Sequence, residues 1–161
     1  MNARKKTIVS VAVIIAIICG LIWVYHPISF YDSFEQISIA YFESRFGADG
    51  EPSTYTADFL FTPQDAEFHQ IKAILGGNAF HRTPTSFFRG NMYWEGPGRH
   101  LICSLISVSE SYFQSFHLAP TPFISIDSSK STGVYRIGYW GNSRVLAMID
   151  DISAILPIDN H

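Results

Sequence analysis

The chain of 161 residues is long enough for one folded domain beside an N-terminal apolar stretch, and its 47% hydrophobic and 15% aromatic residues supply a core. The net charge of −3 is unevenly distributed, because three of the eleven basic residues precede the apolar stretch and all fourteen acidic residues follow it. The part after the stretch therefore carries a net charge of −6, which argues against a nucleic-acid binder, since neutralising phosphates requires a basic surface.

The first expected element is a membrane-spanning helix over residues 8–25. This segment has no charged side chain, and its eighteen residues would cover about 27 Å as a helix, close to the roughly 30 Å of a hydrocarbon core. Trp and Tyr at its outer end suit the membrane interface, and Pro27 ends the helix. The anchor residues that we expect to contact lipid include Ile8, Ile14, Ile18, Leu21, Trp23 and Tyr25.

Basic residues predict the orientation of this anchor. They precede the helix as Arg4, Lys5 and Lys6, and no Lys or Arg follows it until Arg45. The positive-inside rule then keeps the N-terminus in the cytoplasm and exports the rest. The predicted segments are a cytoplasmic N-terminus (1–7), a transmembrane anchor (8–25), a linker (26–32) and an extracytoplasmic domain (33–161).

Two other fates of the apolar stretch compete with an uncleaved signal-anchor in the cell membrane. A cleaved signal peptide requires small residues at its cleavage site and usually a shorter apolar core, and neither is found. A lipoprotein signal requires a small residue before the modified cysteine, whereas Ile18 precedes Cys19. We therefore expect a single-pass membrane protein that keeps its helix.

The domain opens with two predicted strands and a helix. Gln36–Phe42 and Tyr55–Phe61 both alternate apolar and polar residues, and the turn-rich segment between them predicts an antiparallel hairpin with a long loop. Thr62 is a plausible N-cap for a helix over Pro63–Leu75, in which apolar residues recur at helical spacing. Gly76 and the residues after it supply the helix stop.

The second half of the domain is predicted to be mostly strands. Residues 79–99 are less regular and hold at most a short strand within Phe80–Phe88, which the predicted order leaves out. His100–Val108 is apolar on both faces and is expected to be central, with Cys103 as a small buried hydrophobe. Three more strands and a helix capped by Asn142 or Ser143 follow, the strands being Tyr112–Leu118, Phe123–Asp127 and Val134–Trp140.

The predicted fold class is α+β: an N-terminal transmembrane helix followed by an antiparallel sheet with two helices on one face, in the order ββαββββα. Two parts of the chain carry a resemblance: a strand leading into TPQDAEFHQIKAIL (Thr62–Leu75), and VYRIGYW (Val134–Trp140) followed by a helix. Both resemble parts of small membrane-anchored or lipoprotein α+β domains of unknown function from Gram-positive bacteria. The resemblance implies a location and a fold, and it carries no catalytic residues.

Motifs for catalysis or cofactors are missing from the sequence. The six histidines form no H-E-x-x-H, the two cysteines have no metal-binding spacing, and neither G-x-S-x-G nor a phosphate-binding loop is present. We therefore expect no metal, no cofactor and no catalytic residue that sequence alone reveals.

One segment, 87–100, is richer in aromatic and basic residues than a loop requires. Aromatic residues and Arg are enriched at binding hot spots, so we expect it to bind a partner through Phe88, Arg89, Tyr93, Trp94 and Arg99. The competing interpretations are that its aromatic side chains cap the core or rest on lipid headgroups.

The expected function is a non-enzymatic, membrane-anchored extracytoplasmic domain that binds a protein or a cell-envelope component. One alternative is a small envelope hydrolase whose Ser, His and Asp converge only in the folded domain. Another is a membrane-tethered immunity-type inhibitor, because an acidic domain suits a basic toxin.

Overall fold

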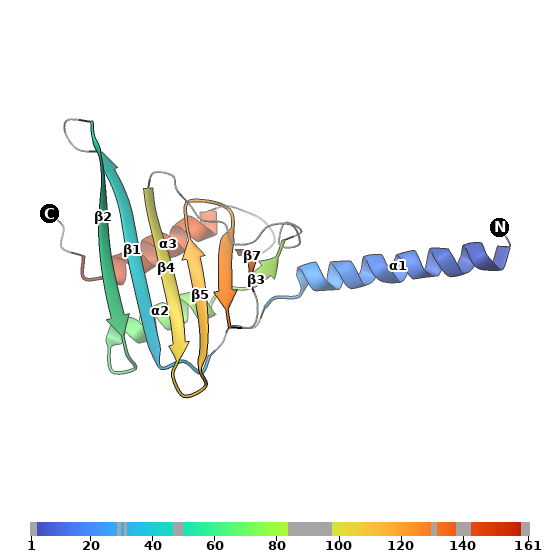
Figure 1. Cartoon of the computed structure of the whole chain (residues 1–161), viewed down its shortest axis with the longest axis horizontal. Coiled ribbons are helices and arrows are strands. Elements are labelled where there is room, and N and C mark those ends of the chain that lie inside the picture. The colour runs from blue at the N-terminus through green and yellow to red at the C-terminus, as the bar shows by residue number, and fades with distance from the viewer. Residues whose placement is uncertain are drawn as a thin grey trace.

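A computed structural model of the chain describes residues 3–28, 30, 32–46, 50–83, 98–129, 132–137 and 143–158. In these ranges a long N-terminal helix, α1 (Ala3–Tyr25), leads into a domain with one seven-stranded sheet and two further helices (Figure 1). The elements of the domain are β1 (Gln36–Phe46), β2 (Pro52–Phe61), α2 (Ala66–Gly76), β3 (Phe80–Arg82), β4 (Gly98–Ser107), β5 (Tyr112–Leu118), β6 (Ile124–Ser128), β7 (Thr132–Ile137) and α3 (Ser143–Ile155).

All neighbouring strands in the sheet are antiparallel, in the order β2-β1-β4-β5-β6-β7-β3. The α+β class and the β1–β2 hairpin are confirmed, but the predicted order ββαββββα is wrong because five strands follow α2. The additional strand is β3, whose three residues are too few to show an alternating pattern. It forms because Phe80 pairs with Ile137 of β7, a contact between residues far apart in the sequence.

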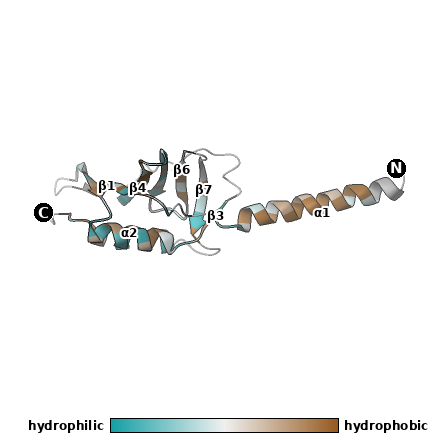
Figure 2. Ribbon diagram, turned by 90° about the horizontal axis from the view of Figure 1, so that it is seen from below, coloured by the Kyte–Doolittle hydropathy of each residue, from teal (hydrophilic) through white to brown (hydrophobic). Residues whose placement is uncertain are grey.

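The core lies between the sheet and its two helices, which cover the same face (Figure 1), and Figure 2 shows α2 packed beneath the strands. The strand register aligns Ile39, Cys103, Phe116 and Ile126 across four neighbouring strands, and all four side chains are buried. The helices bury their apolar stripes against this face through Phe68, Ile71, Leu75, Val145, Ile149 and Ile152.

Within the described residues no helix covers the other face of the sheet, and β4 shows the consequence. Leu101, Cys103 and Leu105 are buried, whereas Ile102 and Ile106 are only half-buried. The interior position expected for His100–Val108 is confirmed, but burial on both faces is not. Because both helices are on one side, an interior strand of this sheet keeps one face partly open.

The helix α2 begins at Ala66, three residues after the predicted Pro63. Thr62 donates two hydrogen bonds to Asp65 Oδ2, from its backbone nitrogen at 2.7 Å and from its hydroxyl at 3.0 Å. These bonds close a turn ahead of the helix, so the Asp65 side chain points backward instead of capping α2. They also lower the pKa of Asp65, first through the backbone hydrogen bond and then through the hydroxyl.

The predicted anchor is a continuous helix, and Thr7–Val24 is long and apolar enough to cross a membrane. Its side chains are exposed at Ile8, Ile14, Ile18 and Leu21, while Trp23 near its end is half-buried. The residues expected to set the orientation, Arg4, Lys5 and Lys6, lie in its first turns, and Tyr25 is its last residue. The orientation and the predicted segment boundaries stay predictions.

Candidate functional site

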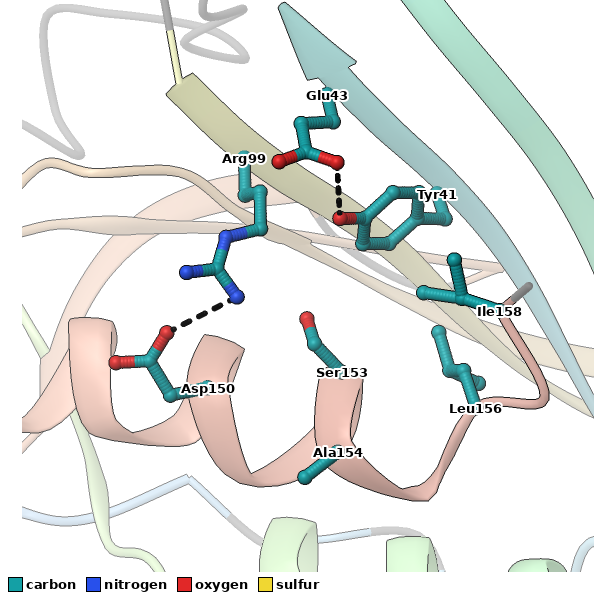
Figure 3. Close-up of a pocket in the computed structure, with 8 residues that line it drawn as sticks. All are labelled: Tyr41, Glu43, Arg99, Asp150, Ser153, Ala154, Leu156 and Ile158. Carbon is teal, nitrogen blue, oxygen red and sulfur yellow. Dashed lines mark hydrogen bonds and ion pairs between the residues drawn. The ribbon is translucent and has the colours of Figure 1, made fainter. Parts of the chain in front are cut away.

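A pocket of about 440 Å³ opens between the C-terminal half of α3 and the neighbouring strands β1 and β4 (Figure 3). Its volume is in the range of small-molecule sites. Most of its polar groups come from the strands and from one helix face. The residues that line it are Tyr41, Glu43, Arg99, Asp150, Ser153, Ala154, Leu156 and Ile158.

The strand register positions the upper wall of the pocket. Glu43 of β1 is directly opposite Arg99 of β4, so the two side chains share one face of the sheet. Tyr41 lies two residues before Glu43 and points to the same face, which is the face that the helices cover. A charged pair thus continues the apolar row of Ile37 and Ile39 toward the end of the strands.

The helix α3 supplies the lower wall. Asp150, Ser153 and Ala154 are three and four residues apart and therefore lie on one side of the helix. That side faces the strands, as Figure 3 shows for the Asp150 and Ser153 side chains. After the helix ends, the chain closes the far end of the pocket with Leu156 and Ile158.

The ion pair between Arg99 and Asp150 in the pocket is loose. Arg99 Nη1 is 3.4 Å from Asp150 Oδ1, longer than the usual 2.7–2.9 Å of a charge-assisted hydrogen bond. The Arg99 and Asp150 side chains are 46% and 63% exposed, so this pair adds little to stability. Tyr41 donates its hydroxyl proton to Glu43 Oε2 at 3.0 Å. Both ends of the Arg99–Asp150 pair remain open to a ligand.

Ser153 carries a buried hydroxyl that lacks a hydrogen-bond partner in the described part of the chain. Its Oγ points from α3 toward the strands, between Arg99 and Tyr41 (Figure 3). A buried polar atom without a partner costs about 1–3 kcal/mol. A ligand in the pocket could provide the missing partner.

Of the five residues predicted to bind a partner, Arg99 lies in this pocket. Phe88, Arg89, Tyr93 and Trp94 lie outside the described residues. The other polar residues of the pocket were missed, although Glu43 gave a signal. It continues the alternating row Ile37, Ile39, Tyr41 and so places a charge on the core-facing side of a strand.

The described strands also bring a Ser, a His and an Asp together on the face of the sheet opposite the two helices, where Ser125 is buried. His117 of β5 is directly opposite Ser125 of β6, and Asp127 is two residues further along β6. Burial lowers the pKa of His117, and the charge of Asp127 acts against this. Both strands are interior, so their backbone amides are used in the sheet. These two strands therefore offer no free backbone donors that would stabilise an oxyanion.

Metal ligands do not gather among the described residues: no group of three or more His, Cys, Asp or Glu side chains could hold an ion there. Cys103 is fully buried, and burial raises the pKa of its thiol to about 12, so it is a core residue and not a nucleophile. Comparison of the chain with protein-family models, with curated proteins and with solved structures found no match.

Proposed function

We propose that this chain is a single-pass membrane protein whose extracytoplasmic domain is a non-enzymatic binding module. Its site is the pocket between β1, β4 and α3, and its ligand group carries both an ammonium and a carboxylate, as in an amino acid or a short peptide. The observation that carries the proposal is the incomplete Arg99–Asp150 ion pair next to the unpartnered Ser153 hydroxyl.

The charges of the pocket favour a ligand of mixed charge. A guanidinium matches a carboxylate geometrically, so Arg99 is the natural partner for a ligand carboxylate. Asp150 and Glu43 are acceptors for an ammonium, and the negative end of the α3 dipole also borders the pocket, at the end that Leu156 closes. A purely anionic ligand would meet two carboxylates, and a purely cationic one would meet Arg99. A zwitterion satisfies both sides.

The binding test uses the full chain in lipid nanodiscs. Calorimetric titration with alanine and with alanyl-alanine should give saturable heat, whereas acetate and methylamine, which carry one charge each, should give none. Arg99→Gln and Asp150→Asn should each abolish the zwitterion signal. The matched control is Lys72→Gln, which breaks another surface ion pair, Lys72 to Asp32 at 2.7 Å. Unchanged titrations in the two pocket variants would overturn the assignment.

The anchoring part of the proposal has its own test. The apolar α1 should keep the protein in the membrane fraction during alkaline carbonate extraction. A cysteine introduced at the exposed Thr54 of β2 should react with an impermeant maleimide added outside intact cells. Release by carbonate would refute the anchor, and protection of that cysteine in intact cells would refute the orientation.

A further inference from the structure

We infer that the β3 edge of the sheet is a membrane-seating surface, on which Arg82 and Arg136 bind the anionic headgroups of phospholipids and hold the domain upright. The inference rests on the anchoring part of the proposed function and is independent of the pocket. It follows from three features: the join between α1 and the sheet, the position of Arg82, and the environment of Arg136.

The join between α1 and the sheet is direct. The His26 nitrogen still donates to Ile22 O at 2.8 Å, which continues the helical pattern past Tyr25. Pro27 then forms an antiparallel bridge with His81, and the Ile28 nitrogen donates to Phe80 O at 2.9 Å. The chain therefore passes from helix to sheet edge within a few residues, and β3 lies where the anchor leaves the bilayer.

Arg82, the last residue of β3, lies against the end of the anchor. Its guanidinium carbon is 4.9 Å from the centroid of the Trp23 ring, within the range of a cation–π contact. Tryptophan near the end of a membrane helix sits at the level of the headgroups. The same contact places the Arg82 guanidinium at that level, where lipid phosphates are its available anions.

Arg136 lies on β7, the strand next to the edge strand β3, and its side chain is on the other face of the sheet. It is directly opposite His81, whereas Arg82 is opposite Tyr135, so the two arginines leave the edge on opposite faces. Arg136 Nε is buried and has no hydrogen-bond partner among the described residues. Arg136 as a whole is only half-buried, so a lipid phosphate can approach its guanidinium although Nε itself is buried.

The elements that meet at the join carry basic and no acidic side chains, as an orientation toward an anionic membrane requires. The three elements at the join, α1, β3 and β7, contain no Asp or Glu. The chain after the anchor is nevertheless acidic overall, with fourteen acidic and eight basic residues. An anionic membrane would attract the basic edge and repel the rest of the domain.

Seating also fixes the height of the pocket. The strands run across the direction of α1 (Figure 1). When α1 stands upright in the membrane, each strand from β3 to β2 therefore lies farther from the membrane than the one before it. With strands about 4.8 Å apart, the outermost strand β2 would be roughly 29 Å above β3. On the same spacing, β4 and β1 would hold the pocket roughly 19–24 Å above that edge.

The test measures the height of the domain in the full chain. Cys19→Ser with Thr54→Cys gives one reactive thiol on β2, since Cys103 is fully buried. Single-molecule energy transfer from this label to acceptor-labelled headgroups reports upright and tilted domains. Nanodiscs of phosphatidylcholine alone are compared with discs that also contain phosphatidylglycerol, at low and high salt.

Wild type should be upright in the anionic discs at low salt. Replacing both arginines, as Arg82→Gln with Arg136→Gln, should lower the upright-to-tilted ratio by about 30-fold, because each arginine near an anionic surface is worth about 1 kcal/mol. Neutral lipid or high salt should have a similar effect on wild type. Arg99→Gln removes a charge four strands from β3 and should behave as wild type.

The outcomes separate the two proposals. Equal distributions in neutral and anionic discs, or an unchanged distribution in the double arginine variant, would overturn the seating surface while leaving the anchor intact. A protein that carbonate removes from the membrane would instead refute the anchor. A loss of the upright population in Arg99→Gln equal to that of the double variant would also overturn the inference, because the effect would then be one of total charge.

Discussion

Removing the Ser153 hydroxyl should stabilise the ligand-free protein, although most substitutions destabilise. In Ser153→Ala the unpartnered buried Oγ is lost, which recovers about 1 kcal/mol, the low end for such groups because the rest of the residue is partly exposed. Alanine also favours a helix over serine by up to roughly 0.5 kcal/mol. Together these effects should raise the thermal midpoint of the full chain by roughly 5 °C.

The matched control is Ser104→Ala, because the Ser104 hydroxyl is paired with that of Ser115 at 2.8 Å. Its loss should lower the free energy of unfolding by about 1 kcal/mol. Thermal unfolding in nanodiscs, followed by near-ultraviolet circular dichroism, compares both variants with wild type. Destabilisation by Ser153→Ala would refute the assignment of an unsatisfied hydroxyl. A gain in the free energy of unfolding of only about 0.5 kcal/mol, which helix propensity alone explains, would refute it as well.

Three further predictions concern the core and its titratable groups. At pH 8 alkylation of Cys103 should be far slower in the folded than in the unfolded chain, because burial hides the thiol from the reagent and raises its pKa; mass spectrometry measures both rates. Burial lowers the pKa of His100 and His117 below 6.5, so the unfolded chain binds more protons than the folded chain. The free energy of unfolding should therefore fall as the pH drops below 6.5. Replacing both histidines with Gln should flatten this pH dependence between pH 7.5 and 5.5. Phe116→Ala should cost about 3–5 kcal/mol in urea titration, whereas Phe113→Ala, at a residue that is 42% exposed, should cost far less.

Most of the fold could be predicted because its strands alternate and its helices carry apolar stripes. The row Ile37, Ile39 and Tyr41 predicted the buried face of β1, and all three side chains are buried. Short elements lack such a pattern, so β3 was left out of the predicted order. The start of α2 was misplaced because Thr62 and Asp65 form a local turn whose geometry competes with helix capping.

The candidate pocket was less accessible to prediction because its residues come from three separate elements. Arg99 was identified from the composition of its own segment, but Glu43 reaches it only through the pairing of β1 with β4. Asp150 belongs to no motif in the sequence, and it lies near Arg99 only because α3 packs over those strands. Pairing partners this far apart in the chain leave no local periodicity to detect.

The exposed surface of α1 has a consequence for the rest of the molecule. Ile8, Ile14, Ile18 and Leu21 are each about half-exposed or more, and such a continuous apolar surface is unfavourable in water. In the proposed anchor lipid would relieve this cost, since the helix is long and apolar enough to cross a membrane. Because α1 continues into the sheet edge through His26 and Pro27, any bilayer that covers the helix must also meet β3. The pocket lies toward the other end of the sheet, so a ligand would reach it from the aqueous phase and not from the bilayer.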